Sequence, residues 1–167
     1  AHQLRRRLPG IPRVIVIDRS PDHLFTASLL WLMVGRRREE QIRRPLARLA
    51  DKGIEFHQTE VEEIDLDGRL VRTRSGAFDV HCLVVALGAR LAPESIAGFD
   101  AMASNLYGLE GCRQICTALN GFSGGTIGVL IPSMPFKCPA APYEAAFLVE
   151  AFCRQKAIRD KTRIHLF

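Results

Sequence analysis

One short stretch, Val14–Asp18 (VIVID), decides which fold class this sequence predicts. Its four successive β-branched residues are typical of a parallel strand that is buried on both faces. Residues 1–8 precede the strand with the pattern of the end of a helix. A helix followed by a buried strand that ends in an acidic residue is the second half of a βαβ unit. The sequence therefore predicts an α/β protein.

The acid at the end of this strand suggests a binding role. In dinucleotide-binding βαβ units such an acid hydrogen-bonds the ribose hydroxyls, and it lies about 20 residues after a glycine-rich, phosphate-binding turn. Counting back that far from Asp18 reaches or passes the start of the chain. We therefore expect the turn to lie upstream of Ala1 in a longer parent protein. Asp18 is a predicted cofactor-binding residue, and a solvated carboxylate at a strand end is the alternative.

The rest of the chain predicts a mixture of short strands and helices. Turn signals at Asp67–Gly68 and Ser75–Gly76 separate alternating segments and predict a small antiparallel β insert. Strands are expected at residues 54–56, 61–64, 69–74, 78–80, 82–86, 126–131 and 163–167, and helices at residues 41–50, 109–119 and 143–155. The last expected strand ends with the chain, which indicates truncation at this end too. We assign residues 1–108 to a first domain and residues 109–167 to the start of a second.

Composition excludes several classes of function. The chain has 23 Lys and Arg against 18 Asp and Glu, a formal net charge of +5. No recognisable docking element accompanies the arginine runs, so we expect no nucleic-acid partner. The five cysteines form no closely spaced CxxC pairs, so no metal site is expected. The longest apolar stretch, Phe25–Val34, is much shorter than the roughly 20 residues of a membrane-spanning helix.

The most distinctive segment is Phe136–Glu144 (FKCPAAPYE), which follows the strand expected at residues 126–131. A unit that binds a pyridine nucleotide would have a glycine-rich turn here to hold the pyrophosphate. The bulky Phe136 and the nearby prolines would obstruct that approach, since proline also removes an amide donor. Cys138 stands beside Lys137 and shortly before a predicted helix. Both features favour the nucleophilic thiolate over the thiol.

These features together resemble a known group of flavoproteins. A strand ending in an acid, an antiparallel insert and then Leu83–Ala89 (LVVALGA) are similar to the flavoprotein disulfide reductase superfamily. There the last segment corresponds to an ATG strand end whose backbone passes close to FAD, and here Leu87 replaces the middle residue. The segment Phe136–Glu144 is similar to the Cys-Pro-x-x-Pro-Tyr-Glu segment of sulfide:quinone oxidoreductases and flavocytochrome c sulfide dehydrogenases.

The resemblance implies a fold and a set of residue roles. The fold would be FAD/NAD(P)-binding Rossmann-like with two dinucleotide-binding domains, the first cut short at residues 1–108 and the second begun at 109–167. Cys138 would be one of a redox pair that carries sulfur taken from sulfide, and Glu144 would handle protons near the flavin. The residues expected to contact FAD are Asp18, Arg19, Val61, Ala86, Gly88 and Ala89.

The resemblance also implies an activity for the parent protein. Electrons would pass from sulfide, or a related small sulfur compound, through Cys138 and FAD to quinone or another acceptor. The chain by itself is expected to be inactive. The parent would lie in the cytoplasm or at the periphery of a membrane, with any membrane contact made through other regions. The alternatives are a flavoprotein similar to NADH:quinone oxidoreductases and a non-catalytic flavin-fold protein that binds a partner.

Overall fold

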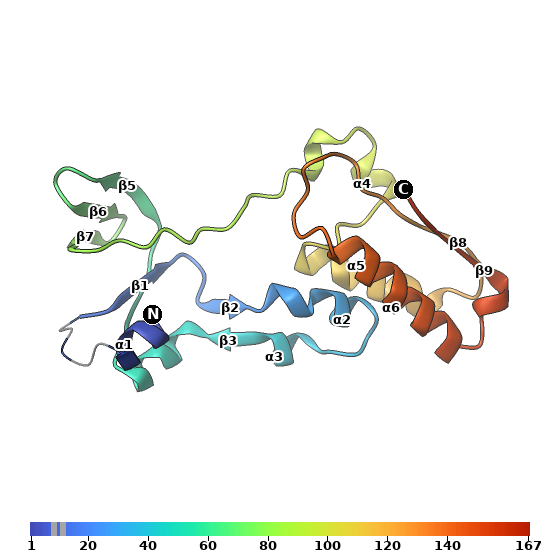
Figure 1. Ribbon diagram of the computed structural model, residues 1–167, viewed down its shortest axis with the longest axis horizontal. Coiled ribbons are helices and arrows are strands. Elements are labelled where there is room, and N and C mark those ends of the chain that lie inside the picture. The colour runs from blue at the N-terminus through green and yellow to red at the C-terminus, as the bar shows by residue number, and fades with distance from the viewer. Residues whose placement is uncertain (8–9, 11–12) are drawn as a thin grey trace. The chain divides into compact units, whose positions relative to one another are not determined.

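The computed structural model describes residues 1–7, 10 and 13–167 and divides the chain into two compact units (Figure 1). The first unit contains Ala1–Leu24 and Arg43–Ala89, and the second contains Phe25–Ile42 and Arg90–Phe167. Both units mix helices with small sheets, so the expected α/β class is confirmed at this level. None of the helices in the described ranges is both long and apolar enough to cross a membrane.

The first unit is built around a pair of parallel strands. Strand β1 (Ile15–Asp18) pairs with β4 (Glu55–Gln58), and Asp18 lies opposite Gln58 at the end of the ladder. Helix α1 (His2–Arg7) precedes β1, as the sequence predicted, although Leu8 lies outside the described residues. Arg13 binds Glu55 at the start of β4 with two hydrogen bonds, of 2.9 Å from Nε and 2.8 Å from Nη2. The parallel strand predicted from VIVID is therefore confirmed. The predicted burial on both faces is wrong, because Ile15, Val16 and Ile17 are half-buried and Asp18 is exposed.

An antiparallel sheet completes the first unit, as the turn signals predicted. Strands β5 (Val61–Asp65), β6 (Leu70–Thr73) and β7 (Gly76–Asp79) pair in the order β5-β6-β7. The Asp65 carboxylate accepts a hydrogen bond of 2.8 Å from the Gly68 amide, which closes the first turn. Gly76 has φ of 145°, a conformation that glycine adopts without strain.

The helix predicted at residues 41–50 is wrong as a single element. Helix α3 (Glu39–Ile42) ends early, β3 (Arg43–Pro45) follows, and the 3₁₀ helix η2 (Leu46–Lys52) ends at Gly53. The reason is Pro45, which has no amide proton for a helix and disfavours helical backbone at the residue before it. Strand β3 instead pairs antiparallel with β2 (Asp22–Leu24).

The second unit contains the two long helices, α5 (Leu109–Gly121) and α6 (Ala141–Gln155). Helix α6 connects β8 (Gly125–Val129) to β9 (Thr162–Leu166), and these two strands pair in parallel. Helix α2 (Leu29–Met33) packs against α5 and α6. The short helix α4 (Phe99–Met102) lies in the segment before α5. Leu29, Met33, Cys112 and Cys153 are almost completely buried and belong to the core of this unit.

The strand predicted at residues 82–86 is wrong. Residues 82–92 follow an extended path with no strand, and Val84 and Val85 are 78% and 61% exposed. Cys82, at the start of this segment, is exposed. A strand buried on both faces needs neighbours that satisfy its amides and carbonyls. No strand in the described ranges pairs with this segment.

Two glycines of α5 differ in how closely other residues pack around them. An alanine methyl at Gly111 would lie 2.1 Å from the carbonyl oxygen of Asn105, whereas one at Gly121 would meet nothing within 4 Å. We expect Gly111→Ala to destabilise the protein by about 1–3 kcal/mol through overpacking. Gly121→Ala should be neutral or stabilising by about 0.5–1 kcal/mol. Urea unfolding of the two variants measures the difference, and equal stabilities would show that the turn is not tightly packed.

The pair between Arg13 and Glu55 predicts an acid-dependent part of the stability. The hydrogen bond from Arg13 lowers the pKa of Glu55 from 4.5 to about 2. A carboxyl whose pKa is lower in the folded than in the unfolded state stabilises the fold at pH values above its unfolded-state pKa. This stabilisation is lost as the pH falls through the folded-state pKa. The urea midpoint of Glu55→Gln should therefore lie below that of the wild type at pH 7 and match it near pH 2.

Asp51→Asn is the matched control, because Asp51 is an exposed carboxyl of the same unit. This change should alter the urea midpoint little at either pH. If Glu55→Gln and the wild type had the same urea midpoint at pH 7, the pair between Arg13 and Glu55 would contribute nothing to stability. The difference should also shrink at high salt, since exposed charge pairs are screened.

Candidate functional site

The carboxyl end of β1 brings two of the predicted cofactor residues to one edge. The backbone carbonyl of Asp18 accepts a hydrogen bond of 3.1 Å from the Thr59 amide, and β5 begins two residues later at Val61. The side-chain Oδ1 of Asp18 accepts a hydrogen bond of 2.8 Å from the Ser20 amide. The Asp18 carboxylate is exposed, and no described residue is bonded to its Oδ2. This oxygen is therefore available to a ligand hydroxyl.

Arg19 lies next to this carboxylate and is exposed. Its carbonyl oxygen accepts a hydrogen bond of 3.4 Å from the side chain of Gln58 at the end of β4. A carboxylate that can accept hydrogen bonds from hydroxyl groups, with an arginine next to it, fits the ribose end of a dinucleotide. The structure thus places Asp18, Arg19 and Val61 together at the edge of the first unit.

Among the described residues, no hydrogen bond joins Ala86, Gly88 or Ala89 to this edge. They lie on the extended segment that the sequence predicted as a strand, and all three are exposed. Gly88 has φ of 71°, so its backbone conformation favours glycine. A methyl at Gly88 would meet no described residue within 4 Å, so the chain leaves open space beside this glycine.

Cys138 stands directly before the first turn of α6. Its φ is 51°, it is exposed, and its carbonyl oxygen accepts a hydrogen bond of 2.9 Å from the amide of Ala141. Pro142 occupies the first turn of the helix, a position where a missing amide proton costs no helical bond. The turn therefore presents the thiol to solvent at the amino-terminal end of a 15-residue helix.

Glu144 lies in the first turn of α6, two residues after Pro142. Its amide donates a hydrogen bond of 3.0 Å to the carbonyl oxygen of Ala140, and its side chain is exposed. An acid in the first turn of a helix is stabilised by the helix dipole. The exposed position lacks the burial that proton handling near neutral pH would need.

Tyr107 is a residue that the sequence reasoning missed. Its hydroxyl oxygen is buried, and it has no hydrogen-bond partner among the residues that the structure describes. Burial raises the pKa of Tyr107, and the nearby Cys138 sulfur raises it further. Nothing in the spacing of Tyr107 and Cys138 along the sequence indicated that they lie near each other. Only the packing of the second unit brings them together.

The remaining cysteines of the second unit differ from Cys138 in their surroundings. Burial raises the pKa of the Cys112 thiol to about 12, and Cys116 adds to this shift. The Cys112 thiol donates to the carbonyl oxygen of Leu106 at 3.1 Å. Cys116 accepts a bond of 3.7 Å from the side chain of Asn120, and Cys153 is fully buried. These contacts favour structural roles for the three thiols.

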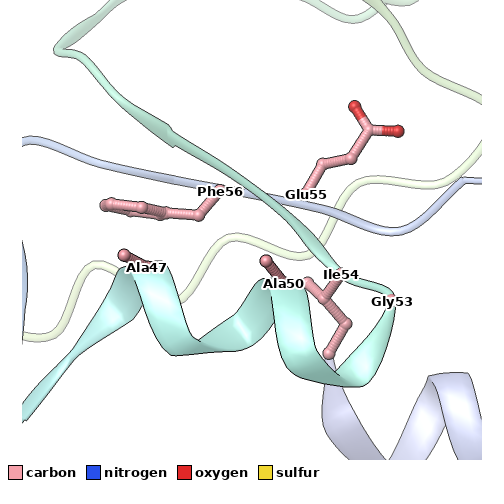
Figure 2. A pocket seen from close by; sticks show the side chains of 6 residues that line it. All are labelled: Ala47, Ala50, Gly53, Ile54, Glu55 and Phe56. Carbon is pink, nitrogen blue, oxygen red and sulfur yellow. The ribbon is translucent and has the colours of Figure 1, made fainter.

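An open pocket in the first unit has no reactive side chain comparable to the Cys138 thiol. Six residues line it, which are Ala47, Ala50, Gly53, Ile54, Glu55 and Phe56. Figure 2 shows the Glu55 carboxylate pointing away from Ala47 and Ala50. Because Glu55 is already bound by Arg13, the pocket wall is apolar with no available catalytic group. Across residues 1–7, 10 and 13–167, no three His, Cys, Asp or Glu side chains are grouped to hold a metal ion.

Comparison with known proteins gives consistent matches along the chain. Residues 113–166 match the family model described as sulfide dehydrogenase (flavocytochrome c) flavoprotein chain, central. The mitochondrial sulfide:quinone oxidoreductase of Mus musculus is 29% identical over 174 residues, which cover 98% of this chain and 38% of the relative. The sulfide-quinone reductase of Aquifex aeolicus (strain VF5) is 30% identical over 177 residues, covering 96% of this chain and 38% of the relative.

A solved structure agrees with the sequence matches. The X-ray structure of the sulfide:quinone oxidoreductase from Aquifex aeolicus superimposes with a TM-score of 0.82 at 26% identity, covering 99% of this chain and 39% of that chain. This chain spans about 38% of the length of the two curated relatives. The resemblance that the segment Phe136–Glu144 indicated is confirmed, because this chain is similar to sulfide:quinone oxidoreductases over almost all of its length.

Proposed function

We propose that the complete protein is an FAD-dependent oxidoreductase that takes electrons from sulfide, or a related small sulfur compound, and passes them to quinone or another acceptor. The observation that carries the proposal is Cys138, an exposed thiol at the start of α6 within a segment similar to that of the relatives. Cys112 and Cys153, by contrast, are buried in the core. Only an accessible sulfur can react with a dissolved sulfur compound.

The chemistry assigned to Cys138 is thiol exchange. The resemblance implies a second cysteine elsewhere in the parent protein that forms a disulfide with Cys138. A hydrosulfide ion attacks the Cys138 sulfur of that disulfide, so that a new sulfur–sulfur bond forms as the old one breaks. Cys138 then carries a persulfide, and the second cysteine leaves as a thiolate with the electron pair. Bound FAD would supply the two-electron acceptor for this thiolate.

The residues around Cys138 support this role. The amino-terminal end of α6 carries partial positive charge, which stabilises a thiolate before it. Lys137 stands next to Cys138 in the sequence and adds a cation to the same turn. We assign Glu144 a role in proton handling near the flavin, which requires that its exposed carboxyl be covered in the assembled enzyme.

The cofactor residues proposed for FAD lie in the first unit. Asp18 would hold a ribose hydroxyl through its available oxygen, with Arg19 and the backbone of Val61 beside it. The small residues Ala86, Gly88 and Ala89 would let the flavin approach the backbone. In this proposal residues 1–108 are part of an FAD-binding domain and residues 109–167 begin a second dinucleotide-binding-like domain. The parallel pair β8 and β9 joined by α6 supports the second assignment.

The same proposal implies where in the cell the parent protein works. The Mus musculus relative is named as mitochondrial. We propose that the parent protein works in the cytoplasm or at the periphery of a membrane, because a quinone acceptor is dissolved in lipid. A non-catalytic flavin-fold protein is one alternative. It would retain its flavin colour when sulfide is added.

The alternative of an NADH:quinone oxidoreductase leads to a direct test. The connection from β8 to α6 contains Pro135, Pro139 and Pro142 where a nicotinamide-binding unit would have a glycine-rich turn. Anaerobic mixing of the full-length holoenzyme with excess NADH should therefore leave the flavin absorbance unchanged, while sulfide should bleach it. Rapid bleaching by NADH would favour the alternative.

Substitution of Cys138 tests the sulfur chemistry. Cys138→Ser in the full-length protein should retain bound FAD but lose sulfide-dependent flavin reduction by about two orders of magnitude or more, because the sulfur that hydrosulfide attacks is removed. Cys116→Ser is the matched control in the same unit and should reduce its flavin at the wild-type rate. Stopped-flow absorbance measures both variants. A normal rate in Cys138→Ser would end the proposal that sulfide reacts at this residue.

A further inference from the structure

A second pocket of the first unit, here called the basic hollow, is lined by basic and apolar side chains. Its volume is about 370 Å³, which lies within the roughly 300–1,000 Å³ of small-molecule sites. The described residues that line it come from α1, β2, β3 and η2, and none of them is acidic. The basic ones are His2, His23, Arg44, Arg48 and Lys52.

The antiparallel pair of β2 and β3 places two of these basic residues side by side (Figure 1). His23 lies directly opposite Arg44 in the ladder, and side chains opposite each other project from the same face. Successive side chains of a strand alternate between its faces, so Asp22 and Arg43 project from the other face. There Arg43 donates a hydrogen bond of 3.4 Å to the Asp22 carboxylate. The acid of β2 is therefore directed away from the basic hollow.

The 3₁₀ helix η2 forms the other side of the basic hollow. The amide of Leu46 donates a hydrogen bond of 2.8 Å to the carbonyl oxygen of Pro21, which ties the start of η2 to the residue before β2. Arg48 and Lys52 are both exposed on η2. Among the described residues, no carboxylate forms an ion pair with either side chain. Their two positive charges are therefore not neutralised within the described part of the chain.

The arrangement of charge favours an anionic ligand. Arg44, Arg48 and Lys52 surround one hollow that has no acidic lining, and like charges held close together repel one another. A bound anion would replace this repulsion with attraction. A phosphate group carries close to two negative charges and three acceptor oxygens, and arginine binds such oxygens in pairs. Phosphate thus matches both the number and the type of these cations.

The apolar part of the lining limits the ligand further. Pro45, Leu46 and Leu49 line the same hollow as the cations. Ligand sites commonly combine an apolar wall with a few polar groups that fix the orientation of the ligand. An inorganic anion would leave this wall in contact with water. A phosphate that carries an apolar substituent would cover the wall and place its charge at the basic side chains.

We propose that the basic hollow binds a phosphate ester that has an apolar substituent. The phosphate lies among Arg44, Arg48 and Lys52, and the apolar substituent packs against the leucines of η2. The binding is non-covalent and leaves the ligand unchanged. This inference does not depend on the sulfur chemistry proposed for Cys138.

Calorimetric titration of the full-length protein with hexyl phosphate and with inorganic phosphate tests the proposal. Hexyl phosphate should bind at one site per chain and about tenfold more tightly than inorganic phosphate, because the hollow covers part of the alkyl group. The double variant Arg48→Gln/Lys52→Gln should bind hexyl phosphate about tenfold more weakly or worse, because hydrogen bonds to a charged group are lost. Equal affinity of this variant and the wild type would overturn the proposed site.

Arg6→Gln/Arg7→Gln is the matched control. Both arginines are exposed on α1 in the same unit and are not among the residues that line the hollow. This variant loses the same charge, and its affinity for hexyl phosphate should match that of the wild type. An equal loss of affinity in both double variants would indicate diffuse attraction of anions to a basic surface and would overturn the site.

The bound flavin and the stability of the protein provide two further readouts. Both double variants should keep the urea midpoint of the wild type, because the replaced side chains are exposed. Both should also retain FAD. Loss of FAD from Arg48→Gln/Lys52→Gln would assign these cations to the flavin and would overturn a separate phosphate site.

Vesicles distinguish the two sources of such a phosphate. The full-length protein is sedimented with phosphatidylcholine vesicles that contain or lack phosphatidic acid. Sedimentation that requires phosphatidic acid and is lost in Arg48→Gln/Lys52→Gln would identify a lipid headgroup as the ligand. Tight binding of hexyl phosphate without sedimentation would identify a soluble phosphate ester. Failure to bind either hexyl phosphate or the vesicles would overturn the proposal.

Discussion

In each unit of this chain two parallel strands pair, β1 with β4 and β8 with β9. A parallel pair cannot be joined by a tight turn, because the chain must first return to the edge where the first strand began. In the second unit α6 makes this return. The residues between β8 and α6 are therefore held at the carboxyl end of one strand and the amino-terminal end of one helix. This constraint places Cys138, and in the first unit it places Asp18 at the end of β1.

The composition of the connection before α6 decides what chemistry this position can perform. A glycine-rich turn would present amide protons to a pyrophosphate, whereas proline offers none and adds bulk. Cys138 occupies this connection with φ of 51° and an exposed side chain. The same geometry that would bind a phosphate in a nucleotide-binding unit is thus suited to a thiolate, since both are anions at the start of a helix.

The cysteines of the second unit differ in how deeply they are buried. Cys112 and Cys153 are fully buried and contribute to the core that α2, α5 and α6 share. Both side chains act as small apolar groups there, and burial raises the pKa of the Cys112 thiol. Cys138 lies outside this core, in the exposed connection before α6.

The sequence by itself determined the features that depend on neighbouring residues. The β-branched run of β1, the turns of the antiparallel insert and the helix periods of α5 and α6 all follow from local backbone preference. The segment around Cys138 also identified the related proteins. Tertiary structure alone decided that residues 82–86 form no strand, because a strand requires partners that no local pattern specifies. It alone also placed Tyr107 near Cys138, since the approach of side chains from distant parts of a chain depends on how the helices pack.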